Sequence, residues 1–432
     1  MGRHGEQQEV LAKSPRRLPR KVMSVLWVLI AAGAVTFLLG ATGPNSLRAW
    51  QIFLVNFLFW SGMAQGGLVF AATYQVTRAR WGGAIRRLAE GMGAFLPVSF
   101  LLFFLLFFGR EVLFPWVLEP IPEKQAWLNA PFLFIRDGLA LLILYGLSLA
   151  YLYFSLRPDL GRASKHSSLF ARGWRGLEAE QERSRRVLAF LAPAFLVLYA
   201  LVFSLIGFDL AMSLDPHWYS TLFGAYFFMS SFYLALAALA VIAVLGRKHL
   251  TLGGQIEQKQ FHDLGKLIFG FCLVTGDFFW SQYVVIWYGN IPEETAYVIL
   301  RTVEMPWAPV AWGVLISAFV IPFLILLSRR VKENPWTLLA VASVIVIGMW
   351  FERYIIIPVS LSINRMPFTW RLYFPRIEIA LTIGTFAMFL LFYLIASRLI
   401  PLVPVWEVQE GQMAHTLRKV GKTRVASVSE FE

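Results

Sequence analysis

Long apolar runs separated by short polar segments make up almost the whole chain. Crossing about 30 Å of hydrocarbon takes about 20 helical residues, and ten of the runs are that long. They cover residues 22–41, 50–76, 88–108, 132–156, 187–211, 220–245, 262–288, 306–328, 336–358 and 377–400. Barrel strands would instead show alternation over shorter stretches. The pattern therefore predicts an all-α integral membrane protein with about ten transmembrane helices.

The positions of the basic residues predict how these helices are oriented. Starting from the N-terminus, every second polar segment is rich in Lys and Arg, and together these segments hold 28 of the 39 basic residues. The segments on the opposite side hold only seven. The positive-inside rule then predicts a multi-pass membrane protein with an even number of helices and both termini cytoplasmic. The net charge of +13 is a topology signal, and no nucleic-acid partner is expected.

Helices two to five and six to nine read as two copies of one unit. "FLFWSG" (57–62) aligns with "YFFMSS" (226–231) at an offset of 169, and Phe208-Asp209 aligns with Phe351-Glu352. Four helices separate the copies, so both cross the membrane in the same direction, as parallel repeats do. The predicted organisation is a cytoplasmic N-terminus (1–21), a peripheral helix (22–49), a four-helix bundle (50–219) with a cytoplasmic loop (157–186), a second four-helix bundle (220–361), a second peripheral helix (362–400) and a cytoplasmic tail (401–432).

Several kinds of redox chemistry are missing from the sequence. Cys272 is the single cysteine, so this chain alone has no C-x-x-C-H haem attachment and no ligand set for an iron-sulfur cluster. No pair of histidines lies at membrane depth, which argues against a b-type haem, and no phosphate-binding loop is present. We therefore expect no cofactor or metal bound by this chain alone.

Ionisable side chains at membrane depth are costly and are candidates for function. Asp137, Asp209, Asp277 and Glu352 fall in the outer half of their helices. Asp277 has no neighbouring base, which favours a functional role. Asp137 and Asp209 are expected near the surface, where wetted structural roles fit at least as well. Adjacent helical residues point about 100° apart, so Glu352 and Arg353 are each expected to pair across helices, and a structural ion pair and proton transfer weigh evenly there.

Two further groups lie near the helix ends. Glu90, His262, Asp263 and Lys266 gather at the inner ends of helices three and seven, where a solvated helix start is the plainer interpretation and cytoplasmic proton uptake the alternative. His217 lies in the short outer loop before helix six. It is a weak candidate for binding a quinone carbonyl, although turn formation, helix capping and aromatic anchoring explain that loop equally well.

Four stretches resemble a known family: "FDLAMSLDPHWYSTLFGAYFF", "HDLGKLIFGF", "SQYVVIWYGNIPEET" and "GMWFERYIIIP". They are similar to the NrfD or polysulfide-reductase-like membrane subunits, and most closely to the F-type subunit of bacterial alternative complex III, over about residues 50–361. The resemblance implies a respiratory quinol:cytochrome c (or other acceptor) oxidoreductase in the inner membrane. It also implies partners, namely a paralogous NrfD-like subunit, an iron-sulfur subunit and a multihaem cytochrome c, which would carry the missing cofactors. F-type subunits are often described as quinone-binding but are discussed mainly as proton-path or structural subunits, and the quinone pool is an expected partner.

The resulting hypothesis is that this chain is a membrane subunit of a redox complex and contains a polar path for protons. The subunit would be either non-catalytic or quinone-binding. The candidate path residues are Asp137, Asp209, Asp277, Glu352, Arg353, Lys266 and His262. A stand-alone proton-coupled transporter is one alternative, since a parallel repeat permits it. A purely structural membrane anchor is another, in which the four acids tolerate amide replacement. On the first hypothesis, Asp277→Asn or Glu352→Gln removes proton movement or coupled turnover.

Overall fold

The computed structural model describes residues 19–79, 81–163, 173–249, 256, 258–363 and 376–399. Throughout these residues the regular structure is helical, and no strand occurs among them. Ten helical stretches in this part are long and apolar enough to cross a membrane, in agreement with the sequence pattern. Most of the predicted N-terminus (1–21), part of the predicted loop (157–186) and the predicted tail (401–432) lie outside the described residues.

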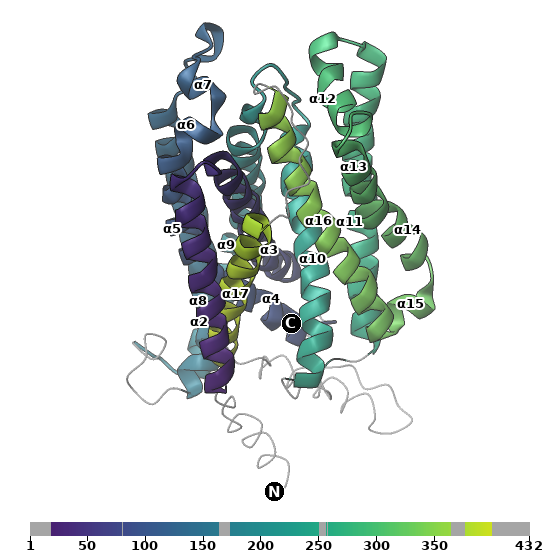
Figure 1. Ribbon diagram of the computed structural model, residues 1–432. Coiled ribbons are helices and arrows are strands. Elements are labelled where there is room, and N and C mark those ends of the chain that lie inside the picture. Colours follow the sequence, from purple (N-terminus) through teal and green to yellow (C-terminus); the bar gives the residue numbers. More distant parts are fainter. Residues whose placement is uncertain are drawn as a thin grey trace, which may run out of the picture.

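The helices run along one common direction, with α6, α7 and α12 at one end of the molecule and α15 at the other (Figure 1). Their bounds are α2 Arg20–Thr42, α3 Ser46–Val76, α4 Gly83–Met92, α5 Leu96–Leu105, α6 Arg110–Leu113, α7 Pro115–Leu118, α8 Ala130–Ala163, α9 Leu177–Leu210, α10 Phe223–His249, α11 Gln258–Gly289, α12 Pro292–Thr302, α13 Trp307–Leu315, α14 Ile321–Leu326, α15 Arg329–Glu333, α16 Pro335–Ile363 and α17 Arg376–Leu399.

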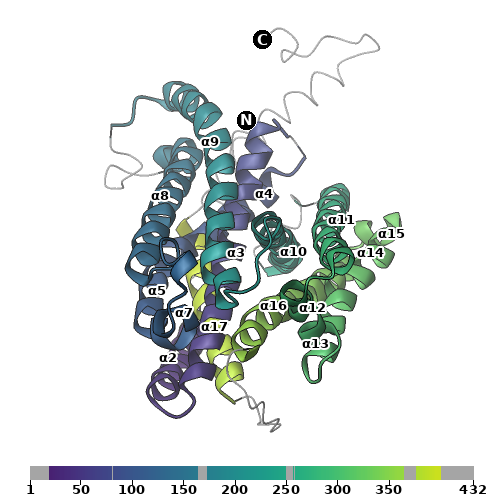
Figure 2. The ribbon, with the colours of Figure 1, turned by 90° about the horizontal axis from the view of Figure 1, so that it is seen from above.

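Viewed along the helices, α3, α10 and α16 lie near the middle (Figure 2). The helices α2, α5 and α8 lie on one side of them, and α11 to α15 lie on the other. The central helix α3 is apolar all round, which is the pattern of a helix buried on every side. Its most apolar 18-residue window is entirely buried, whereas only 17% of that of α11 is. The helix α11 therefore leaves most of this window uncovered.

The third predicted helix and the predicted loop 157–186 differ from the structure in their continuity. The third predicted helix is divided into α4, α5 and α6 by tighter 3-10 turns, with Gly93 and Pro97 at the first division. The predicted loop 157–186 is largely helical, because α8 continues to Ala163 and α9 already begins at Leu177. An ion pair joins these polar helix ends: Nε of Arg157 on α8 lies 2.6 Å from Oε2 of Glu180 on α9.

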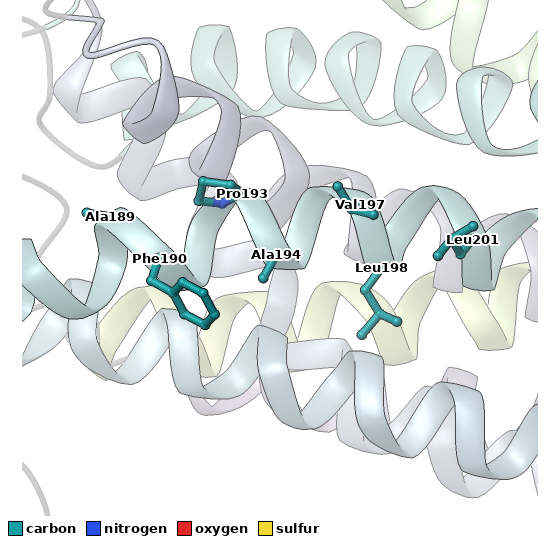
Figure 3. A pocket seen from close by; sticks show the side chains of 7 residues that line it. All are labelled: Ala189, Phe190, Pro193, Ala194, Val197, Leu198 and Leu201. Carbon is teal, nitrogen blue, oxygen red and sulfur yellow. The ribbon is translucent and has the colours of Figure 1, made fainter.

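The outer side of α9 carries an open, apolar groove next to Pro193 (Figure 3). Its lining residues all come from this one helix: Ala189, Phe190, Pro193, Ala194, Val197, Leu198 and Leu201. None of these side chains carries a hydrogen-bond donor. The groove therefore offers apolar contacts only.

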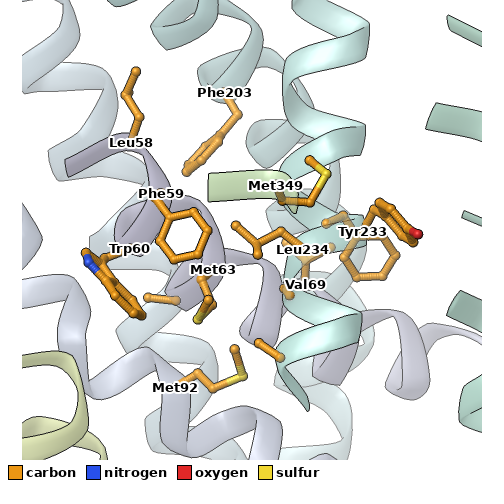
Figure 4. Packing of buried hydrophobic residues seen from close by; sticks show 14 of the residues in the cluster. Leu58, Phe59, Trp60, Met63, Val69, Met92, Phe203, Tyr233, Leu234 and Met349 are labelled. Atoms are coloured by element: carbon orange, nitrogen blue, oxygen red, sulfur yellow. The ribbon is translucent and has the colours of Figure 1, made fainter. Parts of the chain in front are cut away.

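The core forms where α3, α9, α10 and α16 pack together. Figure 4 shows this region with Met63 of α3, Phe203 of α9, Leu234 of α10 and Met349 of α16. These four side chains are at most 3% exposed. Long apolar side chains from four helices interdigitate here, which is the close packing expected of a protein interior.

Corresponding positions of the two sequence copies meet at the contact between α3 and α10. At the offset of 169, Gly62 corresponds to Ser231 and Gly66 to Ala235. A Cβ atom on Gly62 would lie 3.0 Å from Oγ of Ser231, and one on Gly66 would lie 2.5 Å from Cβ of Ala235. The last helix of each copy also packs against the first helix of the other, α9 on α10 and α16 on α3. A two-fold relation produces reciprocal contacts of this kind.

The predicted peripheral helices, α2 and α17, pack against each other and against α3. Gly33 and Gly384 face each other where α2 and α17 cross, and a Cβ atom on Gly33 would lie 2.9 Å from Cα of Gly384. Small residues at such a crossing let two membrane helices approach closely. Arg48 of α3 donates to Glu378 of α17 at 2.7 Å, and this contact fixes the outer end of α17.

Candidate functional site

A buried ion pair joins the ends of α8 and α9. Arg136 donates to Oδ2 of Asp209 from Nε at 3.0 Å and from Nη2 at 2.5 Å. The indole N–H of Trp127 donates to Oδ1 of the same carboxylate at 2.9 Å. The guanidinium of Arg136 also stacks over the Trp127 ring, 3.8 Å from its centroid. Charge-assisted hydrogen bonds of this kind hold the Asp209 carboxylate in a single orientation.

Asp137 lies beside this pair, so the site contains two carboxyl groups and one guanidinium. Its Oδ1 is 3.9 Å from Nε of Arg136, and Asp209 is its electrostatic neighbour. Neither carboxyl oxygen of Asp137 receives a hydrogen bond from a described donor. Asp137 and Asp209 are both 0% exposed. The wetted roles that fitted these two acids at least as well as functional ones do not agree with this burial, and Trp127 of the outer loop contacts the Asp209 carboxylate.

A second buried pair lies on α16. Nη1 of Arg353 donates to both oxygens of Glu352, at 2.9 and 2.8 Å. The expectation that each of these neighbours pairs across helices rather than with the other is wrong for the ion pair itself, because the long Arg353 side chain folds back along its own helix. Both residues also reach α10. Tyr226 donates its O–H to Oε1 of Glu352 at 2.6 Å, and Nη2 of Arg353 donates to Ser230 at 2.8 Å.

The buried acids of the two copies are held by different partners. Asp209 and Glu352 correspond in the repeat, and both are nearly or fully buried. The arginine that holds Asp209 comes from a neighbouring helix, whereas the one that holds Glu352 is the next residue of the same helix. Leu210 stands in the first copy where Arg353 stands in the second. Both copies therefore have a buried acid at the corresponding position, and they differ in which arginine balances its charge.

Polar side chains continue from Glu352 toward the end of the molecule that carries α12. Tyr297 of α12 interacts electrostatically with Glu352, Asp215 and Arg301. Its ring stacks on Trp218, with 3.7 Å between the centroids, and the Arg301 guanidinium lies 3.4 Å from its centroid. These contacts connect the outer loop, α12 and α16 in one cluster.

Burial shifts the titration of the charged members of this cluster. Desolvation raises the pKa of the Asp215 carboxyl above its ordinary value, and the positive charge of Arg301 acts in the opposite direction. Desolvation likewise lowers the pKa of Arg301. Arg301 donates from Nη2 to Oγ of Ser360 on α16 at 2.7 Å, so hydrogen bonding compensates part of the burial cost.

A third buried cluster, between α4 and α8, was not identified from the sequence. Arg87 is 0% exposed. It donates to Oε2 of Glu90 and to Oδ2 of Asp159, in both cases at 2.5 Å. Ser155 donates to the other oxygen of Glu90 at 2.6 Å. The spacing of Arg87 and Glu90, three residues apart on one helix, is the signal that could have indicated the pair. Only the fold shows that Asp159 joins it.

His262, Asp263 and Lys266 lie at the start of α11, opposite α15. Nζ of Lys266 is 2.7 Å from Oδ1 of Asp263, and Nδ1 of His262 is 3.9 Å from the same atom. All three side chains are partly exposed and line an open pocket together with Gln258, Lys259, Arg329 and Glu333. Glu90 was expected in this group, but its described contacts lie within α4 and α8.

The remaining two candidates stand apart from these clusters. Asp277 lies on an exposed face of α11 and makes no described ion pair or hydrogen bond with Asp137, Asp209 or Glu352. His217 is exposed in the outer loop, beside buried Trp218. The structure thus brings together Asp137 with Asp209 and Glu352 with Arg353, and it does not bring all four acids to one place.

A quinone head group requires hydrogen-bond donors beside an apolar cavity. The apolar groove on α9 offers no side-chain donor, and the pocket at the start of α11 is lined by polar and charged residues. Neither of these two pockets therefore fits a whole quinone. Within the described residues no group of three His, Cys, Asp or Glu side chains is placed to hold a metal ion.

Comparison with known proteins identifies the family. The sequence pattern of the family described as polysulphide reductase, NrfD, matches residues 40–364, which is most of the chain and includes both buried acid pairs. A search of curated proteins finds no match. The ten membrane-spanning helices and the extent of the match together show that this chain belongs to the NrfD polysulphide reductase family.

Proposed function

We propose that this chain is a non-catalytic membrane subunit of a quinol:cytochrome c (or other acceptor) oxidoreductase of the alternative complex III type. Membership of the NrfD family implies a membrane subunit of a quinone-interacting oxidoreductase, and members of the family typically partner with iron-sulfur and other redox subunits. The single Cys272 supports the proposal, because this chain alone lacks the ligands for the haem and iron-sulfur groups of such a complex. The proposed partners are a paralogous NrfD-like subunit, an iron-sulfur subunit and a multihaem cytochrome c, in the bacterial inner membrane.

Within that complex we assign the buried acids to proton transfer. The observation that carries this assignment is the presence of a buried carboxyl at corresponding positions of the two copies, Asp209 and Glu352. In the first copy, Asp137 and Asp209 share the single guanidinium of Arg136. Two carboxylates and one cation leave one negative charge unbalanced, and a proton is the simplest group that neutralises it.

The second copy supplies a connection to the outer end. Glu352 accepts a hydrogen bond from Tyr226, and Tyr297 links this region electrostatically to Asp215 in the outer loop. A hydrogen bond such as that between Tyr226 and Glu352 can pass a proton from a phenol to a carboxyl, whereas Tyr297 and Asp215 act on this pair through charge alone. His262, Asp263 and Lys266 are the proposed uptake group at the opposite end, as the sequence hypothesis has it. Asp277 is left out of this path because its side chain faces outward.

The test uses the intact complex reconstituted into vesicles. Glu352→Gln keeps the hydrogen bond from Tyr226 but cannot ionise, so we expect quinol oxidation to continue with a lower number of protons moved per electron. Glu111→Gln is the control, because the Glu111 side chain is 61% exposed at the outer end of α6. An unchanged proton-to-electron ratio in Glu352→Gln would exclude the proton role.

The reciprocal contact of α3 and α10 also permits a stand-alone proton-coupled transporter, because parallel repeats occur in transporters. The two functions differ in what purifies with the chain. A subunit of the proposed complex brings haem-containing partners, whose absorbance is measured directly on the assembly isolated through a tag on this chain. Isolation without haem would favour the transporter.

A further inference from the structure

One face of α11 presents outward-facing side chains at a strict heptad spacing. The positions alternate in steps of four and three residues: Lys266, Gly270, Leu273, Asp277, Trp280, Val284 and Trp287. All of them are exposed except Gly270, which is half-buried. A mean step of 3.5 residues is the period at which one helix packs along another in a left-handed coiled coil. We call this face the α11 seam.

Among the residues that the structure describes, the neighbours of α11 pack on the opposite face and leave the α11 seam exposed. The buried residues of α11 are Phe261, Leu264, Gly265, Ile268, Cys272, Thr275 and Ile286. At the seam, a Cβ atom added to Gly270 would meet no atom within 4 Å, so another helix has room to approach. The aromatic rings of Trp280 and Trp287 are 61% and 67% exposed and offer a large contact area.

Asp277 distinguishes the seam from helix faces that contact lipid. No charged side chain is exposed over residues 22–42 of α2, 138–156 of α8 or 187–208 of α9, as expected for surfaces in hydrocarbon. Asp277 lies in the membrane-spanning part of α11, is exposed, and has no described ion-pair partner. Ionisable side chains within membrane helices almost always face protein or water and pair with a complementary group. The face around Asp277 is therefore a protein contact.

We propose that a transmembrane helix of a different subunit packs along the α11 seam and presents a basic side chain to Asp277. A single polar residue in such a seam fixes the register of the two helices. A second copy of this chain fits poorly, because a two-fold contact at this seam sets the two Asp277 side chains against each other. The inference rests on the proposed function only in that the redox complex supplies the partner subunit.

Photo-crosslinking in the native assembly tests the contact. A benzophenone amino acid is placed at Trp280 or Val284 in the seam, with Leu139 of α8 and Leu201 of α9 as exposed controls. We expect crosslinks from both seam positions to one transmembrane segment of another subunit, with a basic residue within one helical turn of the crosslinked site. Crosslinks only to lipid, to a second copy of this chain, or to a segment without a basic residue would overturn the proposal.

Charge reversal tests the partner's chemistry. Asp277→Lys is expected to lower the seam crosslink yield about tenfold or more, because it sets two cations against each other in a site away from water. Replacing the partner's basic residue with Asp should restore the yield in the double variant. An unchanged yield in Asp277→Lys, or no restoration, would overturn the assigned pairing. Haem content of the same preparations reports on the proposed function separately, so either idea can fail alone.

Discussion

At the scale of single residues, the balance of buried charges distinguishes the two halves. Glu352 is held by Arg353 and Tyr226, and Arg353 also stacks over the Phe227 ring, 4.2 Å from its centroid. Arg353 is 1% exposed, so each charge of the pair depends on the other for compensation. The first half balances Asp209 from a neighbouring helix instead. A substitution at one member of either pair therefore affects more than the contact it removes.

Arg353→Leu should lower the free energy of unfolding by about 3–5 kcal/mol, since it leaves Glu352 buried without a counter-ion. The double variant Glu352→Gln with Arg353→Leu should recover part of that loss, because no uncompensated charge remains. Denaturant unfolding in detergent measures both, and Arg110→Leu, at a partly exposed position, is the control. Strictly additive effects of the two substitutions would contradict the coupling.

Asp215 should make stability depend on pH in the acid range. Burial raises its pKa in the folded state above the ordinary value of 3.8. The stability linked to the neutral carboxyl is therefore fully present below pH 3.8 and is lost as the pH rises through the folded pKa. We expect Asp215→Asn to remove this part of the pH dependence and to be at least as stable as the native chain at pH 7. Melting temperatures across the acid range check this, and a variant with the native pH dependence refutes it.

At the scale of elements, small residues set the distances between helices. Gly62 and Gly66 let α3 approach α10, and Gly33 and Gly384 let α2 approach α17. Apolar surface does not drive association inside a bilayer, so close packing of this kind and interhelical hydrogen bonds supply much of the cohesion. Trp60 of α3, for example, donates its indole N–H to Thr385 of α17 at 3.0 Å.

Gly33→Leu should separate α2 from α17 and destabilise the protein by about 1–3 kcal/mol, since added side-chain atoms collide with the facing backbone. Gly146→Leu is the matched control, because a Cβ atom on Gly146 meets nothing within 4 Å on the outer face of α8. Thermal unfolding in detergent compares the two. Equal melting temperatures would show that the glycine crossing does not limit stability.

At the scale of the whole molecule, the two copies surround a shared core but expose different amounts of surface. The most apolar window of α8 is 39% buried, whereas that of its counterpart in the second copy, the stretch Trp307–Leu326 that contains α13 and α14, is only 11% buried. The second copy also presents the α11 seam with Asp277. The two copies are therefore similar in fold but differ in surface, and within the described residues only the second presents a seam suited to a further subunit. The crosslinking experiment tests this expectation.

Much of the fold could be predicted because an apolar run of about 20 residues indicates each membrane helix. The candidate site was only partly predictable. The acids Asp137, Asp209, Asp277 and Glu352 stand out because a carboxyl in an apolar run is rare. Their partners do not, since Trp127 and Tyr226 are ordinary residues of membrane proteins until the fold places them against a carboxylate.

The sequence by itself determined the class of the protein, the number and approximate ends of its helices, and the positions of the acids. These follow from the length of apolar runs and the cost of charge in hydrocarbon, which are local properties. Only the tertiary structure decided that Arg353 folds back on Glu352, that Arg136 joins Asp209, and that Asp277 faces outward. Those outcomes depend on which helix faces meet. The groups that fix them, such as Trp127 at Asp209 and Ser230 at Arg353, lie far from these residues in the chain.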